Sequence, residues 1–240
     1  MKTKSNILIP MIIPSVAMPS GFKSSILIWS MILAPALLLT NLLPSSAALA
    51  QPCQIPGPDT VAIVFDLDYQ YMPVCQEFMG IGPLVEAYLV LINPSEPSGI
   101  MGWELGLDIE LGTQFLVDLY IVGAPIIQPP ELPDLQIGLS ECLPWGPVIQ
   151  LATLTFLVIS PDPVTFYIRP VASPTVPNQI VYAACDDPSS FLTMQTINDS
   201  WTEIVAILNG SDCELAPVLC ADPAIANDVL SWGAMKSLFK

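Results

Sequence analysis

The chain has 240 residues, of which 52% are hydrophobic and only 12% are charged. Six Lys and Arg residues stand against 22 Asp and Glu residues, a formal net charge of −16, and histidine is absent. A chain this acidic repels phosphate backbones and anionic lipid, so nucleic-acid partners are excluded. Without histidine it also cannot form a Ser-His-Asp or Cys-His catalytic pair.

The first fifty residues differ in kind from the rest, because they contain three of the six cations and no acid. An uncharged apolar stretch, 26–43, is followed by the small-residue pattern Ala48-x-Ala50. This order is typical of a secretory signal peptide, so we predict a signal-peptide helix and cleavage before Gln51. Met18 heads a shorter leader of the same kind, and an uncleaved membrane anchor is the alternative.

The part that follows the leader is more acidic still. It combines the remaining three cations with all 22 acids, which gives a net charge of −19. Such a surface attracts divalent cations or a basic partner, although solubility by self-repulsion is the simpler interpretation. We predict a secreted protein that is periplasmic, cell-surface or extracellular, with no membrane contact beyond the signal peptide.

All six cysteines also lie beyond the leader. An even number of cysteines in an exported chain predicts disulfides. Zinc would require C-x-x-C pairs or histidines, and the chain has neither. Six cysteines allow fifteen pairings, and spacing suggests only a short loop closed by Cys213 and Cys220. The disulfide candidates are Cys53, Cys75, Cys142, Cys185, Cys213 and Cys220.

The part beyond the leader has the length of one domain. Proline and glycine recur at short intervals, with β-branched or aromatic runs between them. We therefore predict an all-β fold with about nine strands, a sandwich or a barrel. The alternation along residues 103–110 favours an antiparallel two-sheet sandwich. The expected organisation is signal peptide 1–50, linker 51–58, sandwich 59–210, and a disulfide-bearing C-terminal segment and tail, 211–240. The expected strands are 60–66, 83–92, 100–110, 113–122, 134–140, 147–159, 163–169, 178–184 and 201–208.

Residues 103–110 give the clearest strand signal. Apolar and acidic side chains alternate there, so one face of the strand points to a core and the other to solvent. A helix would need a period of 3.6 residues, which this segment lacks. The inward set is Trp103, Leu105, Leu107 and Ile109, and the solvent-facing set is Glu104, Asp108 and Glu110.

One motif favours catalysis. The apolar strand that ends in Asp66-x-Asp68 resembles the nucleophile motif of haloacid-dehalogenase-type phosphatases, and Asp187 would belong to that family's metal-binding acidic pair. That chemistry requires a parallel sheet with helical crossovers and fixed positive charge around the phosphoryl group. Proline-rich connections and three cations argue against both, so we predict no enzyme and keep an exported phosphatase as an alternative.

Acidic residues and tryptophans provide the candidate metal and ligand sites. Carboxylates near turns suit calcium, and Asp66, Asp68, Asp186 and Asp187 are the candidate ligands, with a solvated acidic surface as the competing interpretation. No other cofactor is predicted. Trp145 lies between prolines and could form a sugar-binding platform, although packing in the core or against its loop is the favoured interpretation of this residue. Trp103 and Trp201 are expected in core strands. The candidate ligand-binding residues are Trp145, Glu104, Asp108 and Glu110.

Two segments resemble a known family. Residues 88–95, a strand with an Asn-Pro-Ser turn, and 100–105, a returning Gly-Trp-Glu-Leu strand, resemble cohesin-like and carbohydrate-binding-module-like bacterial extracellular β-sandwiches. The resemblance implies a nine-stranded jelly roll that acts as a scaffold or ligand-binding module. The ending, 231–240, is similar to tails on secreted proteins of Gram-negative bacteria, which implies an export or attachment tag.

We therefore predict a secreted, non-catalytic binding or scaffold module at the bacterial surface. Its expected partner is a protein or a carbohydrate, and calcium would be a stabilising ion. Two alternatives remain open from the sequence: the phosphatase that uses Asp66 and Asp68, and a structural subunit of a surface layer or filament.

Overall fold

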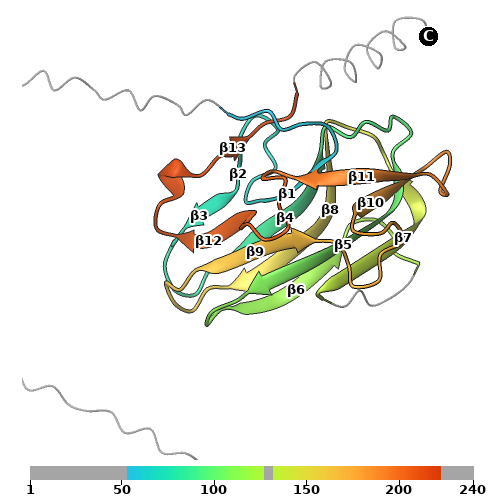
Figure 1. Ribbon diagram of the computed structural model, residues 1–240. Helices are drawn as coiled ribbons and strands as arrows, with labels where there is room; N and C mark the ends of the chain where they lie inside the picture. Colours follow the sequence, from blue (N-terminus) through green and yellow to red (C-terminus); the bar gives the residue numbers. More distant parts are fainter. Residues whose placement is uncertain (1–52, 127–131, 223–240) are drawn as a thin grey trace, which may run out of the picture. The chain divides into compact units, whose positions relative to one another are not determined.

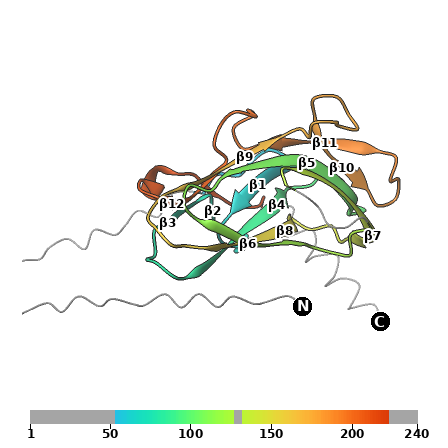
Figure 2. The same ribbon diagram turned by 90° about the horizontal axis from the view of Figure 1, so that it is seen from below.

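The computed structural model describes residues 53–126 and 132–222, all within one compact unit. Thirteen strands and one 3-10 turn build this part, which contains no α-helix. The strands form two layers that lie face to face (Figures 1 and 2), so the predicted all-β sandwich is confirmed. Pairing is antiparallel except between β1 and β11 and between β3 and β12.

The first sheet has the strand order β1–β4–β8–β6. Its two central strands are long aliphatic runs that pair over nine positions, as expected for strands with paired neighbours on both edges. β6 pairs only with β8 and forms the edge of this sheet within the described residues. The bounds are β1 Thr60–Val64, β4 Leu84–Ile92, β6 Phe115–Ile121 and β8 Val148–Leu157.

The second sheet is built around β5, the strand with the alternating pattern. β11 pairs with β10 of this sheet and with β1 of the first, so the two layers are hydrogen-bonded to each other along one side. The bounds are β3 Cys75–Glu77, β5 Ile100–Glu110, β7 Asp134–Leu143, β9 Val164–Arg169, β10 Ile180–Ala184, β11 Phe191–Thr196 and β12 Ala206–Gly210.

β9 and β10 lie end to end along one edge of β5. β7 occupies the other edge, since Gly106 pairs with both β9 and β7, and Glu104 pairs with both β10 and β7. Between β9 and β10 the chain leaves the sheet as the loop 170–179 and then returns to the same edge. This loop stands over the outer face of β5 and shapes the surface described below.

The core lies between the two sheets and takes the inward side chains of β5. Trp103, Leu105 and Leu107 are buried, as the alternation predicts. From the facing sheet Phe156 packs edge-on against Phe166, with ring centroids 5.5 Å apart. Such aromatic pairs bury large apolar areas. The inward side chains of both sheets together form the core that holds the sheets face to face.

Three disulfides join parts of the chain that are far apart in sequence. The predicted Cys213–Cys220 loop is wrong, because each of these cysteines is bonded to one near the start of the domain. Two short strands, β2 Met72–Pro73 and β13 Val218–Leu219, pair beside them, and the 3-10 turn Cys213–Leu215 follows β12. The pairs are Cys53–Cys220, Cys75–Cys213 and Cys142–Cys185.

The predicted strands match the observed ones with two main exceptions. The segment 201–208 is extended only from Ala206 onward, so Trp201 lies in a loop with 36% of its surface exposed and is not a core residue as expected. β11 was not predicted, because its sequence mixes polar and apolar residues without a clean alternation. The signal peptide and the C-terminal tail lie outside the described residues. Within the described residues, no helix is long and apolar enough to cross a bilayer.

Candidate binding groove on the outer face of the second sheet

A row of three very small residues crosses the outer face of the second sheet. Gly102 of β5 pairs with Gly138 of β7 on one edge and with Ala183 of β10 on the other. Paired residues point to the same face of a sheet, so this row leaves a shallow floor where side chains would otherwise stand. A Cβ atom at Gly102 would lie 2.6 Å from the carbonyl oxygen of Ile137, and only glycine fits there.

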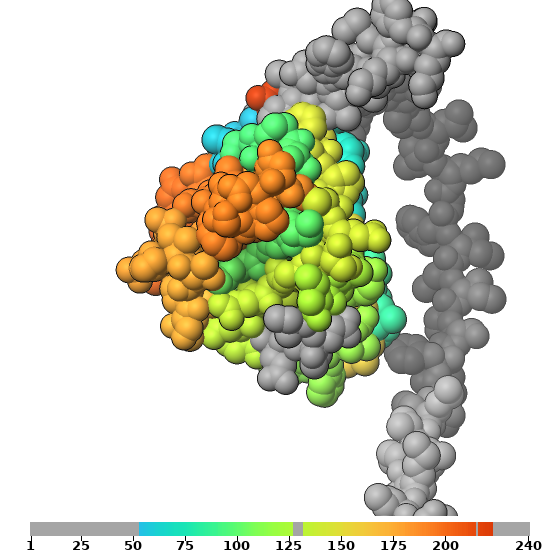
Figure 3. All heavy atoms as spheres, turned by 90° about the vertical axis from the view of Figure 1, so that its right-hand side faces the viewer, coloured from blue at the N-terminus to red at the C-terminus, as the bar shows by residue number. Residues whose placement is uncertain are grey.

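Larger side chains rise at both ends of this floor. Phe191 of β11 pairs with Ala183 and is 45% exposed, and Ile126, beside Gly138, is 68% exposed. Together with Pro188 they border a groove of about 420 Å³. In Figure 3 the green residues of β5 lie between the orange β10–β11 hairpin and the yellow-green residues of β7. The groove is a recess with apolar walls on an otherwise acidic domain.

Glu104 closes one end of the groove, and its position differs from the prediction. It points to the outer face of β5, but only 6% of it is exposed, because the loop 170–179 folds over it. Its carboxylate accepts hydrogen bonds from the backbone N–H and the Oγ1 hydroxyl of Thr175, each 2.8 Å long, and from Nε2 of Gln136 at 2.9 Å. Three donors compensate the buried charge, so Glu104 holds the loop against the sheet.

Asp108, the next predicted ligand-binding acid, is paired with Arg169. The guanidinium donates to both oxygens of Asp108, at 2.7 and 3.1 Å, and to Asp134 at 2.8 Å. The hydrogen bond from Arg169 to Asp108 also raises the pKa of the guanidinium. Arg169 is the one basic residue in ranges 53–126 and 132–222, and it is already held by two carboxylates. An anionic ligand would therefore find no available cation in this part of the chain.

The remaining predicted ligand-binding residues lie apart from the groove. Glu110 is exposed and accepts hydrogen bonds from the hydroxyls of Thr165 and Tyr167, at 3.0 and 3.4 Å. Trp145 is half-buried, and its indole N–H donates to the backbone oxygen of Pro94 at 3.1 Å. The structure thus places the three acids on one face of β5, as predicted, but Trp145 does not line the groove.

Three of the four candidate calcium ligands, Asp66, Asp68 and Asp187, form local turns. The predicted strand 60–66 ends earlier, at Val64, so Asp66 and Asp68 lie outside β1. Each accepts a hydrogen bond from a backbone N–H two residues ahead. Asp187 accepts such a bond from the N–H of Ser189, whose hydroxyl also donates to it at 2.6 Å. Nowhere in the described residues do three or more Cys, Asp or Glu side chains gather closely enough to hold a metal ion.

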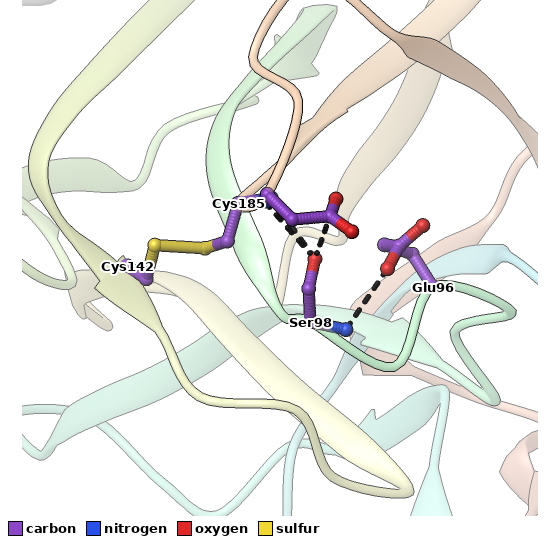
Figure 4. The surroundings of a disulfide bond; sticks show 5 residues. Glu96, Ser98, Cys142 and Cys185 are labelled. Carbon is purple, nitrogen blue, oxygen red and sulfur yellow. Dashed lines mark hydrogen bonds between the residues drawn. A yellow bond between two sulfur atoms is a disulfide. The ribbon is translucent and has the colours of Figure 1, made fainter.

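Asp186 lies beside a disulfide just past the end of β10. The disulfide between Cys142 and Cys185 ties the end of β7 to the end of β10 (Figure 4). Beside it, the hydroxyl of Ser98 donates to Asp186 at 3.2 Å and accepts from the backbone N–H of Cys185, also at 3.2 Å. The N–H of Ser98 in turn donates to Glu96 at 2.9 Å. These bonds fix the loop that carries Pro188.

No protein-family model matches the chain, and no curated protein matches it. Among solved structures, its fold is similar to those of type II cohesins. A type II cohesin domain from the cellulosome of Acetivibrio cellulolyticus has 13% sequence identity and a TM-score of 0.42; the match covers 64% of this chain and 96% of that one. The type II cohesin dyad from the adaptor ScaA scaffoldin of the same organism has 13% identity and a TM-score of 0.39, over 64% and 49% of the chains.

Sequence reasoning missed the residues that make the groove. Phe191 and Ile126 carry no motif, and their approach depends on the register of β10, β5 and β7. One signal was present: Gly102 interrupts the strand pattern of β5, and glycine inside a strand often marks a close approach of another chain segment.

Proposed function

We propose that this chain is a non-catalytic binding module that holds an apolar side chain of a protein partner in the groove between Ile126 and Phe191. The observation that carries the proposal is the floor formed by Gly102, Gly138 and Ala183, which is sunk between two exposed apolar walls. Concave, mostly apolar sites with a few fixed polar groups are the usual form of a binding pocket.

The groove is held in shape before any partner arrives. Glu104 anchors the loop at one end, and the Cys142–Cys185 disulfide anchors the rim at the other. A preformed site loses little conformational entropy on binding, which favours affinity. This rigid frame therefore favours a binding function over catalysis by a moving loop.

The charge around the groove selects the partner. Three exposed acids, Glu141, Asp186 and Asp187, lie close in sequence to the Cys142–Cys185 disulfide, beside the ends of β7 and β10 that flank the groove floor. No described basic residue other than Arg169 balances them. Complementary potentials raise association rates and exclude partners of the same sign. The expected partner segment therefore places an aliphatic or aromatic side chain between Lys or Arg residues.

The phosphatase alternative gains no support from the arrangement of the acids. The strand before Asp66 is flanked by antiparallel β4 and by β11, and no helix crosses between parallel strands in the described part of the chain. Asp66 and Asp68 do not gather with Asp187 into a metal-binding group. Binding, not phosphoryl transfer, is the function that this surface supports.

The proposed setting is outside the cytoplasm. All six cysteines are paired in the structure, and disulfides persist in oxidising compartments. Together with the predicted leader, they support export to the bacterial surface. A binding module there would connect its own chain to a basic surface protein.

A displayed peptide library tests the proposal directly. Selection on the immobilised domain should enrich peptides with one large apolar residue flanked by Lys or Arg. Gly138→Leu should abolish their binding: a Cβ at Gly138 meets only the Ile126 side chain, at 3.9 Å, so the leucine fits and fills the groove. Thr155→Leu, on the outer face of the other sheet, is the matched control. Enriched peptides that bind Gly138→Leu as well as the parent would place the site elsewhere.

A further inference from the structure

The outer face of the first sheet carries a second ordered surface. The register sets Tyr88 of β4, Thr153 of β8 and Tyr120 of β6 in one row across three strands. The next row, two residues along β8, contains Glu86, Thr155 and Asp118. Asp118 and Tyr120 are two residues apart and therefore share this face, and the bulge at Val117 separates them from Leu116 earlier on β6. The two rows form what we call the Tyr-Thr-acid face.

The Tyr-Thr-acid face is exposed to solvent, whereas the opposite face of the same strands packs in the core. Tyr120 is 58% exposed, Glu86 and Asp118 are exposed, and both threonines are partly exposed. Neighbouring strands lie about 4.8 Å apart, so the face spans roughly 10 Å from β4 to β6. Isolated aromatic residues are common on protein surfaces. Here, aromatic rings and hydrogen-bond acceptors are aligned in rows, so one ligand could contact both.

One hydrogen bond shows how the aromatic side chains lie on this face. The hydroxyl of Tyr88 donates to Glu86 at 2.6 Å, and Glu86 is two residues earlier on the same strand. The phenol must therefore lean along β4 and lie over the sheet instead of standing upright. The same bond raises the pKa of Tyr88 to about 12. Tyr88 is thus fixed as a flat aromatic element beside the threonines.

The chemistry of the face favours hydroxyl-rich ligands over peptides. β4 and β8 have hydrogen-bonded neighbours on both edges, so an extended peptide could add a strand only beside β6, and over the face itself it would meet side chains only. Sugar hydroxyls can donate to the carboxylates of Glu86 and Asp118 and to the threonine oxygens. The apolar face of a sugar ring can pack on Tyr120, whose ring is wide and rigid.

From this arrangement we infer that the Tyr-Thr-acid face binds a neutral polysaccharide chain. The two carboxylates repel uronic acids and phosphorylated sugars, and the one described cation, Arg169, is held by two carboxylates on the second sheet. The domain would then hold a protein on one sheet and a glycan on the other. The second site does not depend on the first.

Affinity gel electrophoresis of the full chain tests this inference. Native gels containing hydroxyethyl cellulose, galactomannan or laminarin serve as probes, and alginate is the anionic comparison. At least one neutral gel should retard the protein, and alginate should not. Tyr120→Ala and Asp118→Asn should each weaken binding about tenfold, because each removes one stacking or charged hydrogen-bond contact.

Trp201→Ala is the matched control, since it removes an exposed aromatic residue that lies in a loop outside the first sheet and should leave retardation unchanged. Absence of retardation in every neutral gel would overturn the inference, as would equal retardation of the parent and both variants. Self-association that Tyr120→Ala abolishes, seen by sedimentation without any polysaccharide, would also overturn it and assign the face to a second copy. None of these outcomes bears on the groove, so the two sites can fail separately.

Discussion

Gly106 and Arg169 face each other across β5 and β9, and the missing side chain at Gly106 gives the guanidinium room to lie against the sheet. A Cβ atom at Gly106 would lie 2.8 Å from the central carbon of the guanidinium. In this position Arg169 reaches Asp108 on one strand and Asp134 on another. A glycine inside a strand thus allows the one described cation to bridge three strands.

Gly106→Ala should therefore destabilise the domain by about 1–3 kcal/mol, because the added methyl group displaces Arg169 from both partners. Urea unfolding measures the change. Gly138→Ala is the control: its Cβ would make only an ordinary contact with Ile126, so the same chemical change should leave the free energy of unfolding nearly unchanged. Equal losses of unfolding free energy in the two variants would show that replacing any strand glycine destabilises the domain, and that displacement of Arg169 is not the cause.

Arg169→Lys should cost about 1 kcal/mol, because an ammonium group cannot reproduce the forked contact with both oxygens of Asp108. Thermal unfolding at low and high salt measures the effect. The difference between parent and variant should shrink as salt rises, since both carboxylates are partly exposed and screened. A variant as stable as the parent at low salt would contradict the bridging role.

Glu104→Ala should free the loop 170–179 and destabilise the fold by about 1–3 kcal/mol, because Thr175 and Gln136 lose their shared acceptor. Limited proteolysis should show new cleavage inside this loop. Glu110→Ala is the matched control, since Glu110 lies on the same strand face but is exposed. Unchanged cleavage in Glu104→Ala would mean that the loop is held by other contacts.

Stability should also fall at low pH through Asp162. Hydrogen bonds from the hydroxyls of Thr113 and Ser160 lower the pKa of this carboxyl below 3.8 in the folded state. A lowered folded-state pKa stabilises the protein above the unfolded value and loses this contribution as pH falls through the folded value. Thr113→Val should flatten the fall in melting temperature below about pH 4, and an unchanged pH profile would contradict the assignment.

The sequence-based predictions succeeded where local patterns decide the outcome. Alternation placed Trp103 in the core and the acids on the outer face of β5, and the segment that begins with the Asn-Pro-Ser turn connects β4 to β5. The same pattern could not show that Glu104 is covered, because its cover comes from a loop about 70 residues away. It also could not pair Cys213 with Cys75, since pairing follows the fold and not the spacing.

The groove was beyond prediction for a related reason. Its floor requires Gly102, Gly138 and Ala183 to align, and a shift of one residue in the β5–β7 pairing would replace Gly138 by Ile137 or Leu139. Trp201 was predicted in the core, and that prediction was wrong. Its place at the start of the predicted strand 201–208 suggested a core position, but the strand begins only at Ala206, and the ring lies on the surface.

The groove claim is tested most directly by a nuclear magnetic resonance titration of the ¹⁵N-labelled domain with a library-selected basic, apolar peptide. Binding in the groove predicts the largest shifts at the backbone amides of Gly102, Gly138 and Ala183, and their loss in Gly138→Leu. Shifts centred on the Tyr-Thr-acid face, or spread over the acidic surface without a maximum at these residues, would contradict it.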